Sequence, residues 1–110
     1  MSWTFKHKNL AAGRWFELSL AEQMGNIGSE VWRALRGRGE DKKQFWNAVE
    51  RVLELFDLTL EDQRWRGRRV EIARAREVFC DAVYGGKLYK SSLEGLTRYF
   101  DQFAFAAANK

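Results

Sequence analysis

The helical spacing of the apolar residues, repeated in four segments separated by glycines, constrains the fold of this chain most. Apolar side chains that recur every three or four residues lie on one face of an α-helix and are buried together. The chain contains no proline, the residue that most strongly interrupts a helix. The pattern therefore predicts an all-α protein.

The four segments predict helices at about 14–36, 41–61 and 67–84, and from Ser91 or Ser92 onward. Their apolar stripes are Phe16, Leu20, Met24, Ile27, Val31 and Leu35; Phe45, Val49, Val52 and Phe56; Ile72, Ala75 and Phe79 with Ala82 or Val83; and Leu93, Leu96, Phe100, Phe103 and Ala107. Asp41 has the side-chain chemistry of an N-cap for the second helix, and Gly37 is a plausible stop for the first.

Short connections between helices of this length predict an antiparallel up-and-down four-helix bundle. With 110 residues the chain is long enough for one domain. We assign residues 14–110 to the bundle and residues 1–13 to a short irregular N-terminal arm, in which Trp3 and Phe5 alternate with polar residues.

Two glycines lie inside the first predicted helix, at positions 25 and 28. Glycine in a helix interior costs up to about 1 kcal/mol relative to alanine. Two glycines so close together indicate a requirement such as the close approach of another backbone. We therefore expect Gly25 and Gly28 to face a neighbouring helix.

Positive charge is concentrated in two short segments. The arginine-rich segment, residues 64–76, carries a net charge of +5, and residues 33–38 carry +3, whereas the whole chain carries +4. Concentrated positive charge produces a local field that attracts anions such as nucleic acid. The candidate phosphate contacts are Arg64, Arg66, Arg68, Arg69 and Arg76, with Arg33, Arg36 and Arg38 second. Trp65 is a candidate for base stacking, and Arg66, Arg69 and Arg76 are expected to form one ridge.

The sequence offers little for catalysis. His7 lies in the predicted arm, and Cys80 lies beside an apolar stripe, where cysteine usually acts as a small hydrophobe. The carboxylates of Glu50, Glu54 and Asp57 share a helix face, but no histidine follows at the spacing of a di-metal site. We predict no catalytic residue, no metal and no cofactor.

No membrane or targeting segment is evident from the pattern. The first residues contain no apolar stretch of signal-peptide length, and no run approaches the roughly 18 apolar residues of a spanning helix. The expectation is a cytoplasmic protein without a membrane partner.

Four tryptophans lie off or at the edge of the apolar stripes, and two interpretations of them remain open. They are Trp15, Trp32, Trp46 and Trp65. They are either boundary packing within one subunit or part of a subunit interface, where tryptophan is enriched.

Three stretches of the sequence resemble those of a known family. The stretches are EQMGNIGSE at 22–30, KQFWNA at 43–48 and LEL at 53–55, with arginines between the first and the second. They resemble the 23S rRNA intervening-sequence proteins and the related accessory variability determinant of diversity-generating retroelements.

The resemblance implies a four-helix bundle that assembles into a barrel-like homopentamer. It also implies a non-enzymatic protein that binds nucleic acid, RNA or DNA, through a basic surface and binds a reverse transcriptase. By position, Asn26, Ile27 and Glu30 belong to the family motif. We interpret this motif as structural: Gly25 and Gly28 let helices approach, while Asn26 and Glu30 satisfy polar groups.

The preferred function from sequence is therefore a non-enzymatic, oligomeric protein that binds nucleic acid, as an accessory factor to a reverse transcriptase or ribonucleoprotein. The alternative is a structural or protein-interaction module. In that alternative the arginines form salt bridges with carboxylates across a subunit interface, and the tryptophans are buried there.

Overall fold

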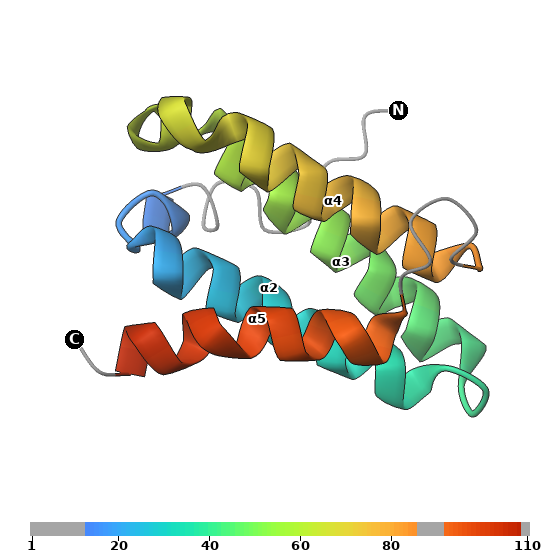
Figure 1. Ribbon diagram of the computed structural model, residues 1–110. Helices are drawn as coiled ribbons and strands as arrows, with labels where there is room; N and C mark the ends of the chain where they lie inside the picture. Colours follow the sequence, from blue (N-terminus) through green and yellow to red (C-terminus); the bar gives the residue numbers. More distant parts are fainter. Residues whose placement is uncertain (1–12, 86–91, 109–110) are drawn as a thin grey trace.

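The computed structural model describes residues 13–85 and 92–108, and all of its regular structure is helical (Figure 1). The elements are α2 (Leu20–Gly37), α3 (Lys42–Glu61), the 3₁₀ helix η1 (Gln63–Arg68), α4 (Arg69–Val83) and α5 (Leu93–Ala108). Within the described ranges there is no β-strand, which confirms the predicted all-α class. Residues 1–12, which make up nearly all of the predicted N-terminal arm, lie outside the described residues.

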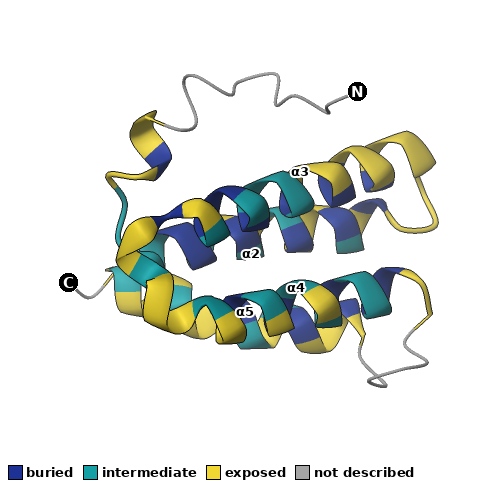
Figure 2. Cartoon of the chain, turned by 90° about the horizontal axis from the view of Figure 1, so that it is seen from above, coloured by how far each residue is buried: buried dark blue, intermediate teal, exposed yellow. Residues whose placement is uncertain are grey.

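The four long helices pack in two layers. Helix α2 packs against both α3 and α5, while α4 packs against α3 and, less extensively, against α5. Figure 2 shows α2 and α3 together in one layer and α4 and α5 in the other. None of the helices in the described ranges combines the length and apolar character needed to span a membrane.

The first long helix begins later than its apolar spacing predicts. The prediction of a start at Arg14 is wrong, because Ser19 caps α2 at its N-terminus. Its hydroxyl oxygen accepts a hydrogen bond from the Glu22 N–H (3.1 Å), and the Glu22 carboxylate accepts one from the Ser19 N–H (2.8 Å). This reciprocal pair is a capping box, which fixes a helix start strongly.

Other helix ends agree more closely with the sequence. Asp41 caps α3 by accepting a hydrogen bond from the Gln44 N–H (3.1 Å), and α2 ends at Gly37, as predicted. The Ser92 hydroxyl accepts from the Gly95 N–H (3.0 Å) at the start of α5. Helix α4 begins at Arg69 instead of Gly67, because η1 precedes it.

The core lies between the two layers (Figure 2). Its largest fully buried side chains are three phenylalanines from three helices: the Phe56 ring centroid lies 6.5 Å from that of Phe79 and 6.2 Å from that of Phe100. Because all three are buried, they join α3, α4 and α5 through one apolar cluster. Burying side chains of this size is the main favourable contribution to folding.

Two glycines of α2 face α5, which agrees with the close helix approach predicted from their positions. A Cβ added at Gly25 would lie 3.3 Å from the Ala104 Cα, and one added at Gly28 would lie 2.5 Å from the Phe100 Cβ. The two helices therefore approach so closely that a side chain at Gly28 has no room. The residue order of these contacts shows that α2 and α5 run in opposite directions.

Candidate functional site

The arginine-rich segment forms η1 and the first part of α4, at one end of the molecule (Figure 1). Asp62 caps η1 by accepting a hydrogen bond from the Arg64 N–H (3.0 Å). Trp65 has non-helical backbone angles (φ −103°, ψ 22°), so the chain bends within η1. Arg66 consequently precedes α4, and it does not share a helical ridge with Arg69 and Arg76.

A buried polar network underlies this segment. The Gln23 amide is its centre: its NH₂ group donates to the Trp15 carbonyl (2.8 Å) and to the Asp62 carboxylate (3.1 Å). Its oxygen accepts from the Trp65 indole N–H (2.7 Å). The Trp15 indole N–H in turn donates to the Thr59 hydroxyl (3.0 Å). The network joins the start of α2 to the end of α3 and to η1, in an interior where unsatisfied polar groups are costly.

Arg64 closes this network from the surface side. Its guanidinium donates to both oxygens of Asp62 (3.0 and 2.7 Å) and to the Leu18 carbonyl (2.6 Å). It also lies over the Trp65 ring, 4.4 Å from the centroid. These contacts give Arg64 a structural role, and they cover one face of the indole proposed for base stacking.

The Arg64 guanidinium lowers the pKa of the Asp62 carboxyl below its usual range, although burial opposes the shift. A carboxyl with a depressed pKa contributes stability above its unfolded pKa, about 4. That contribution is lost as the pH falls through the lower pKa of the folded state. The contribution of Asp62 to the network therefore weakens in acid.

Three further arginines of the segment also bind groups of this chain. Arg68 pairs with Glu71 (2.5 Å), and Arg76 pairs with Asp57 of α3 (3.1 Å). The Arg69 side chain donates to the Leu60 carbonyl at the end of α3 (3.0 Å). Arg69 and Arg76 thus share the face of α4 that packs on α3.

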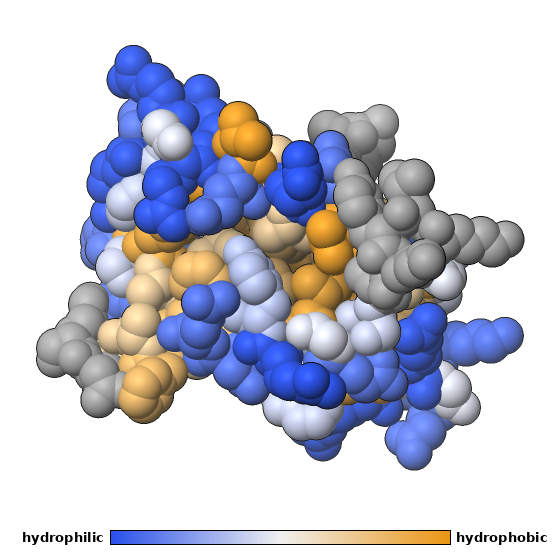
Figure 3. All heavy atoms as spheres, viewed as in Figure 1, coloured by the Kyte–Doolittle hydropathy of each residue, from blue (hydrophilic) through white to orange (hydrophobic). Residues whose placement is uncertain are grey.

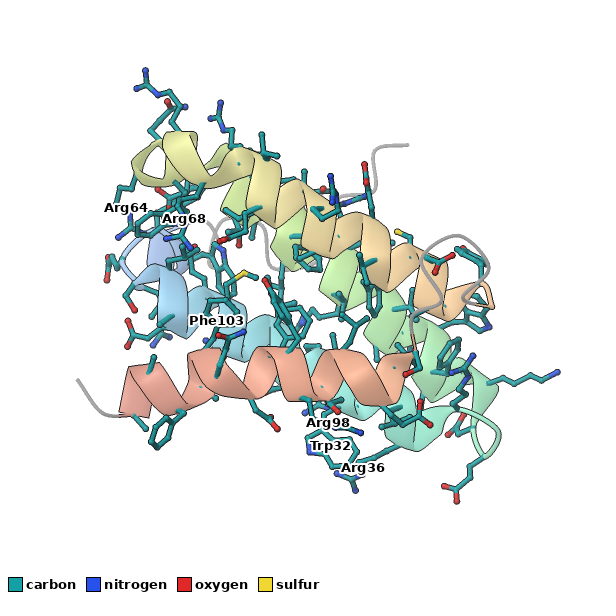
Figure 4. The ribbon with its side chains drawn as sticks, viewed as in Figure 1. Trp32, Arg36, Arg64, Arg68, Arg98 and Phe103 are labelled. Atoms are coloured by element: carbon teal, nitrogen blue, oxygen red, sulfur yellow. The ribbon has the colours of Figure 1, made fainter. Side chains whose placement is uncertain are left out.

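A different pair of arginines accompanies an exposed tryptophan. Trp32 and Arg36 lie one turn apart on α2, and in Figure 4 they project to the same side of the molecule as Arg98 of α5. More than half of the Trp32 surface, 54%, is exposed. Neither Arg36 nor Arg98 belongs to the ion pairs found among the described residues.

The packing of α2 against α5 places Trp32 and Arg98 at the same level along the axis of the helix pair. Gly28 lies opposite Phe100 in the antiparallel pair. One turn further along α2, Trp32 is therefore level with the turn of α5 that precedes Phe100, which contains Arg98. We call Trp32, Arg36 and Arg98 the tryptophan–arginine surface.

The turn after α2 extends this positive region. Arg38 is exposed, and Arg33 is largely exposed, with a loose contact to Glu30 (3.5 Å). Arg33, Arg36 and Arg38 were predicted as second-rank phosphate contacts, whereas Arg98 was missed. No basic residue lies near Arg98 in the sequence, so the charge pattern did not mark it as a phosphate contact. It comes close to Trp32 and Arg36 only because α5 packs on α2.

The residues of the proposed family motif are buried, face α5, or contact neighbouring residues of α2. Ile27 is fully buried, and Gly25 and Gly28 face α5. The Asn26 amide donates to the Glu22 carbonyl (2.8 Å) on the exposed side of α2, and Glu30 contacts Arg33. These contacts are consistent with a structural interpretation of the motif.

An apolar groove runs between α4 and α5, where the two helices diverge (Figure 3). It has a volume of about 420 Å³, and its apolar lining comes from Ala75, Val78, Leu96 and Tyr99. Burial raises the pKa of the Tyr99 hydroxyl, which stays protonated at neutral pH. In the described ranges no three histidine, cysteine or carboxylate side chains are grouped to hold a metal ion.

The chain matches no known family model, no curated protein sequence and no solved structure. The resemblance to the intervening-sequence and accessory-determinant family therefore stays a prediction.

Proposed function

We propose that this chain is a non-enzymatic nucleic-acid-binding protein and that its four long helices form an antiparallel up-and-down bundle. The circuit of contacts from α2 to α3, α4, α5 and back to α2 supports the bundle. The tryptophan–arginine surface supports nucleic-acid binding. A role beside a reverse transcriptase or within a ribonucleoprotein rests on the sequence resemblance alone.

The observation that carries the proposal is the projection of two arginines, which form no ion pair with the described residues, beside an exposed tryptophan. The guanidinium of arginine pairs bidentately with phosphate, and it is never neutral in proteins. Arg36 and Arg98 can offer this geometry without giving up an ion pair among the described residues. An indole between two such groups adds a flat apolar face that suits a base or a sugar.

The arginine-rich segment is a weaker candidate for the first phosphate contacts. Arg64, Arg69 and Arg76 already donate to groups of α3, of η1 or of the turn before α2. Binding a phosphate there would break contacts that hold the fold. Arg66 is the exposed exception, and it serves in this proposal as a peripheral contact together with Arg38.

The test is fluorescence anisotropy of labelled RNA and DNA oligonucleotides at low and near-physiological salt. The double variant Arg36→Ala/Arg98→Ala is expected to bind at least about tenfold more weakly, since it loses two phosphate contacts. The slope of log K against log salt should fall by about 2, because each contact contributes about 0.9.

The matched control is Arg51→Ala/Arg74→Ala, which removes the same charge from exposed positions on α3 and α4. This control should weaken nucleic-acid binding less than Arg36→Ala/Arg98→Ala does, because it lowers only the overall positive charge of the protein. If both double variants lose affinity equally, the binding is not localised at the tryptophan–arginine surface. If the unmodified protein binds neither nucleic acid at low salt, the proposed function is wrong.

A second candidate function, a self-assembling interaction module, is favoured by the apolar surface. Val70 is 80% exposed near the start of α4, and the apolar groove lies between α4 and α5. Such surfaces are more common at protein interfaces than on isolated monomers.

Analytical ultracentrifugation across a range of protein concentrations checks this second candidate. Self-assembly predicts a mass that is a multiple of the 12.9 kDa chain. The homopentamer that the family resemblance implies would have five times that mass. The Val70→Lys substitution is then expected to lower the mass, because burying an unpaired lysine in an interface is costly. A constant mass of one chain would exclude the module.

A further inference from the structure

We infer that the nucleic acid bound by this protein is single-stranded, and that unpaired bases stack on exposed aromatic rings on both sides of the α2–α3 turn. This inference rests on the proposed function, and it names the ligand class of that site. The rings are Trp32 on one side and the pair formed by Trp46 and Tyr84 on the other.

The carrying feature is the stretch from Trp32 to Trp46, which spans the end of α2, the turn and the start of α3. An exposed tryptophan stands at each end of it, with 54% of Trp32 and 47% of Trp46 accessible. Between them lie five basic and two acidic residues, for a net charge of +3. Positive charge on the chain that connects two exposed rings matches the combination of basic groups and aromatic faces that single-strand binding proteins use.

The second aromatic face is built from two helices. The Trp46 ring lies 6.2 Å from that of Tyr84, at the end of α4, with 40° between the ring planes. The buried Phe45 ring meets Trp46 edge to face at 4.9 Å. These contacts hold the indole in place while 47% of Trp46 and 72% of Tyr84 stay exposed.

Cations lie close to both faces. Arg36 and Arg98 accompany Trp32, while Lys42 and Lys43 lie one turn before Trp46 on the same helix and are both exposed. Arg38 lies in the turn between the two faces. A strand that crosses the turn would therefore meet guanidinium or ammonium groups beside each base-stacking position.

The rings select single strands because the bases of a duplex already stack on one another. A tryptophan on the outside of a helix can take a base only when that base is unpaired and turned outward. The phosphate contacts, by contrast, are available to either form. The arginines should therefore set the salt dependence, and the rings should set the preference for single strands.

The test compares single-stranded RNA, single-stranded DNA and blunt DNA duplex in the same anisotropy titration. The unmodified protein is expected to bind the single strands roughly tenfold more tightly than the duplex. Trp32→Ala and Trp46→Ala should each weaken single-strand binding by about tenfold, because one stacked base is lost. The salt slope should not change, which separates stacking from phosphate contacts.

Trp32→Phe keeps an aromatic ring and should retain most of the affinity. Phe105→Ala is the matched control, because it removes an exposed ring of α5 outside the α2–α3 end. Circular dichroism melts should show that the variants fold like the parent, since the substituted side chains are exposed.

The outcomes separate this inference from the proposed function. Equal binding of duplex and single strand, with no effect of Trp32→Ala, overturns the inference while the arginine variants still decide the proposed function. Failure to bind any nucleic acid overturns both. If the tryptophan variants instead lower the mass of an assembly and leave binding unchanged, the rings form a contact between copies and the inference is wrong.

Discussion

Replacing Gly28 by valine is expected to lower the free energy of unfolding by about 3 kcal/mol, the upper range for overpacking a core. A Cβ at this position would lie 2.5 Å from the Phe100 Cβ, far inside van der Waals contact. Because the opposing atom is next to the backbone, no rotation of the ring relieves the clash. Helix α5 itself must move away from α2, and urea denaturation measures the cost.

Substitutions at two further glycines show how the loss of stability depends on the space around the added side chain. Gly25→Ala should be milder than Gly28→Ala, since its nearest neighbour is the Ala104 Cα at 3.3 Å. Gly67→Ala is the control, because no atom lies within 4 Å of the added methyl group. It should raise stability by about 0.5 kcal/mol, through a less flexible unfolded chain. A Gly28→Val protein as stable as the parent would show that α2 and α5 do not pack this closely.

Replacing Asp62 by alanine is expected to destabilise the fold by about 2 kcal/mol, within the range for losing hydrogen bonds to a charged group and leaving a buried donor unpaired. The carboxylate is only 4% exposed, and it accepts hydrogen bonds from Arg64 and Gln23. It also caps η1 through the Arg64 N–H. Its removal leaves a buried amide group and a helix end with fewer partners, and chemical denaturation at neutral pH gives the difference.

Acid titration tests the electrostatic part of this prediction. Since the pKa of Asp62 is lowered in the folded state, its stabilisation is complete above about pH 4 and is lost as the pH falls further. Asp62→Asn keeps the shape of the side chain without its charge. In this variant the free energy of unfolding should therefore decrease less as the pH falls below about 4. An unchanged decrease in Asp62→Asn would mean that the Asp62–Arg64 pair contributes no stability.

Periodicity predicted the helices well where apolar spacing and capping agreed, and it failed where they competed. Phe16 continues the spacing of α2 backwards, but it is a partly exposed turn residue in the structure. The sequence held a contrary signal in Ser19 and Glu22, whose spacing is that of a capping box. Local hydrogen bonds decided this helix start, and an apolar residue at matching spacing misled the prediction.

The candidate site was less predictable, because charge along a sequence does not show which arginines find partners. Arg64 and Arg76 belong to the densest basic segment, yet a local contact pairs Arg64 with Asp62 and a tertiary contact pairs Arg76 with Asp57. Arg98, which stands alone in the sequence, becomes part of the tryptophan–arginine surface only when α5 packs on α2. The position of Trp32 off the apolar stripe was the one local signal for this surface.

The contact between Gly28 and Phe100 has an evolutionary consequence. The Phe100 Cβ fills the space that a Cβ at position 28 would need, so a side chain at 28 is tolerable only when position 100 becomes glycine. Among descendants of this sequence, substitutions at these two sites should therefore accumulate as compensated pairs. The same coupling should appear in a double-mutant cycle, in which Phe100→Gly, which removes the opposing Cβ, makes Gly28→Ala less destabilising than it is in the parent.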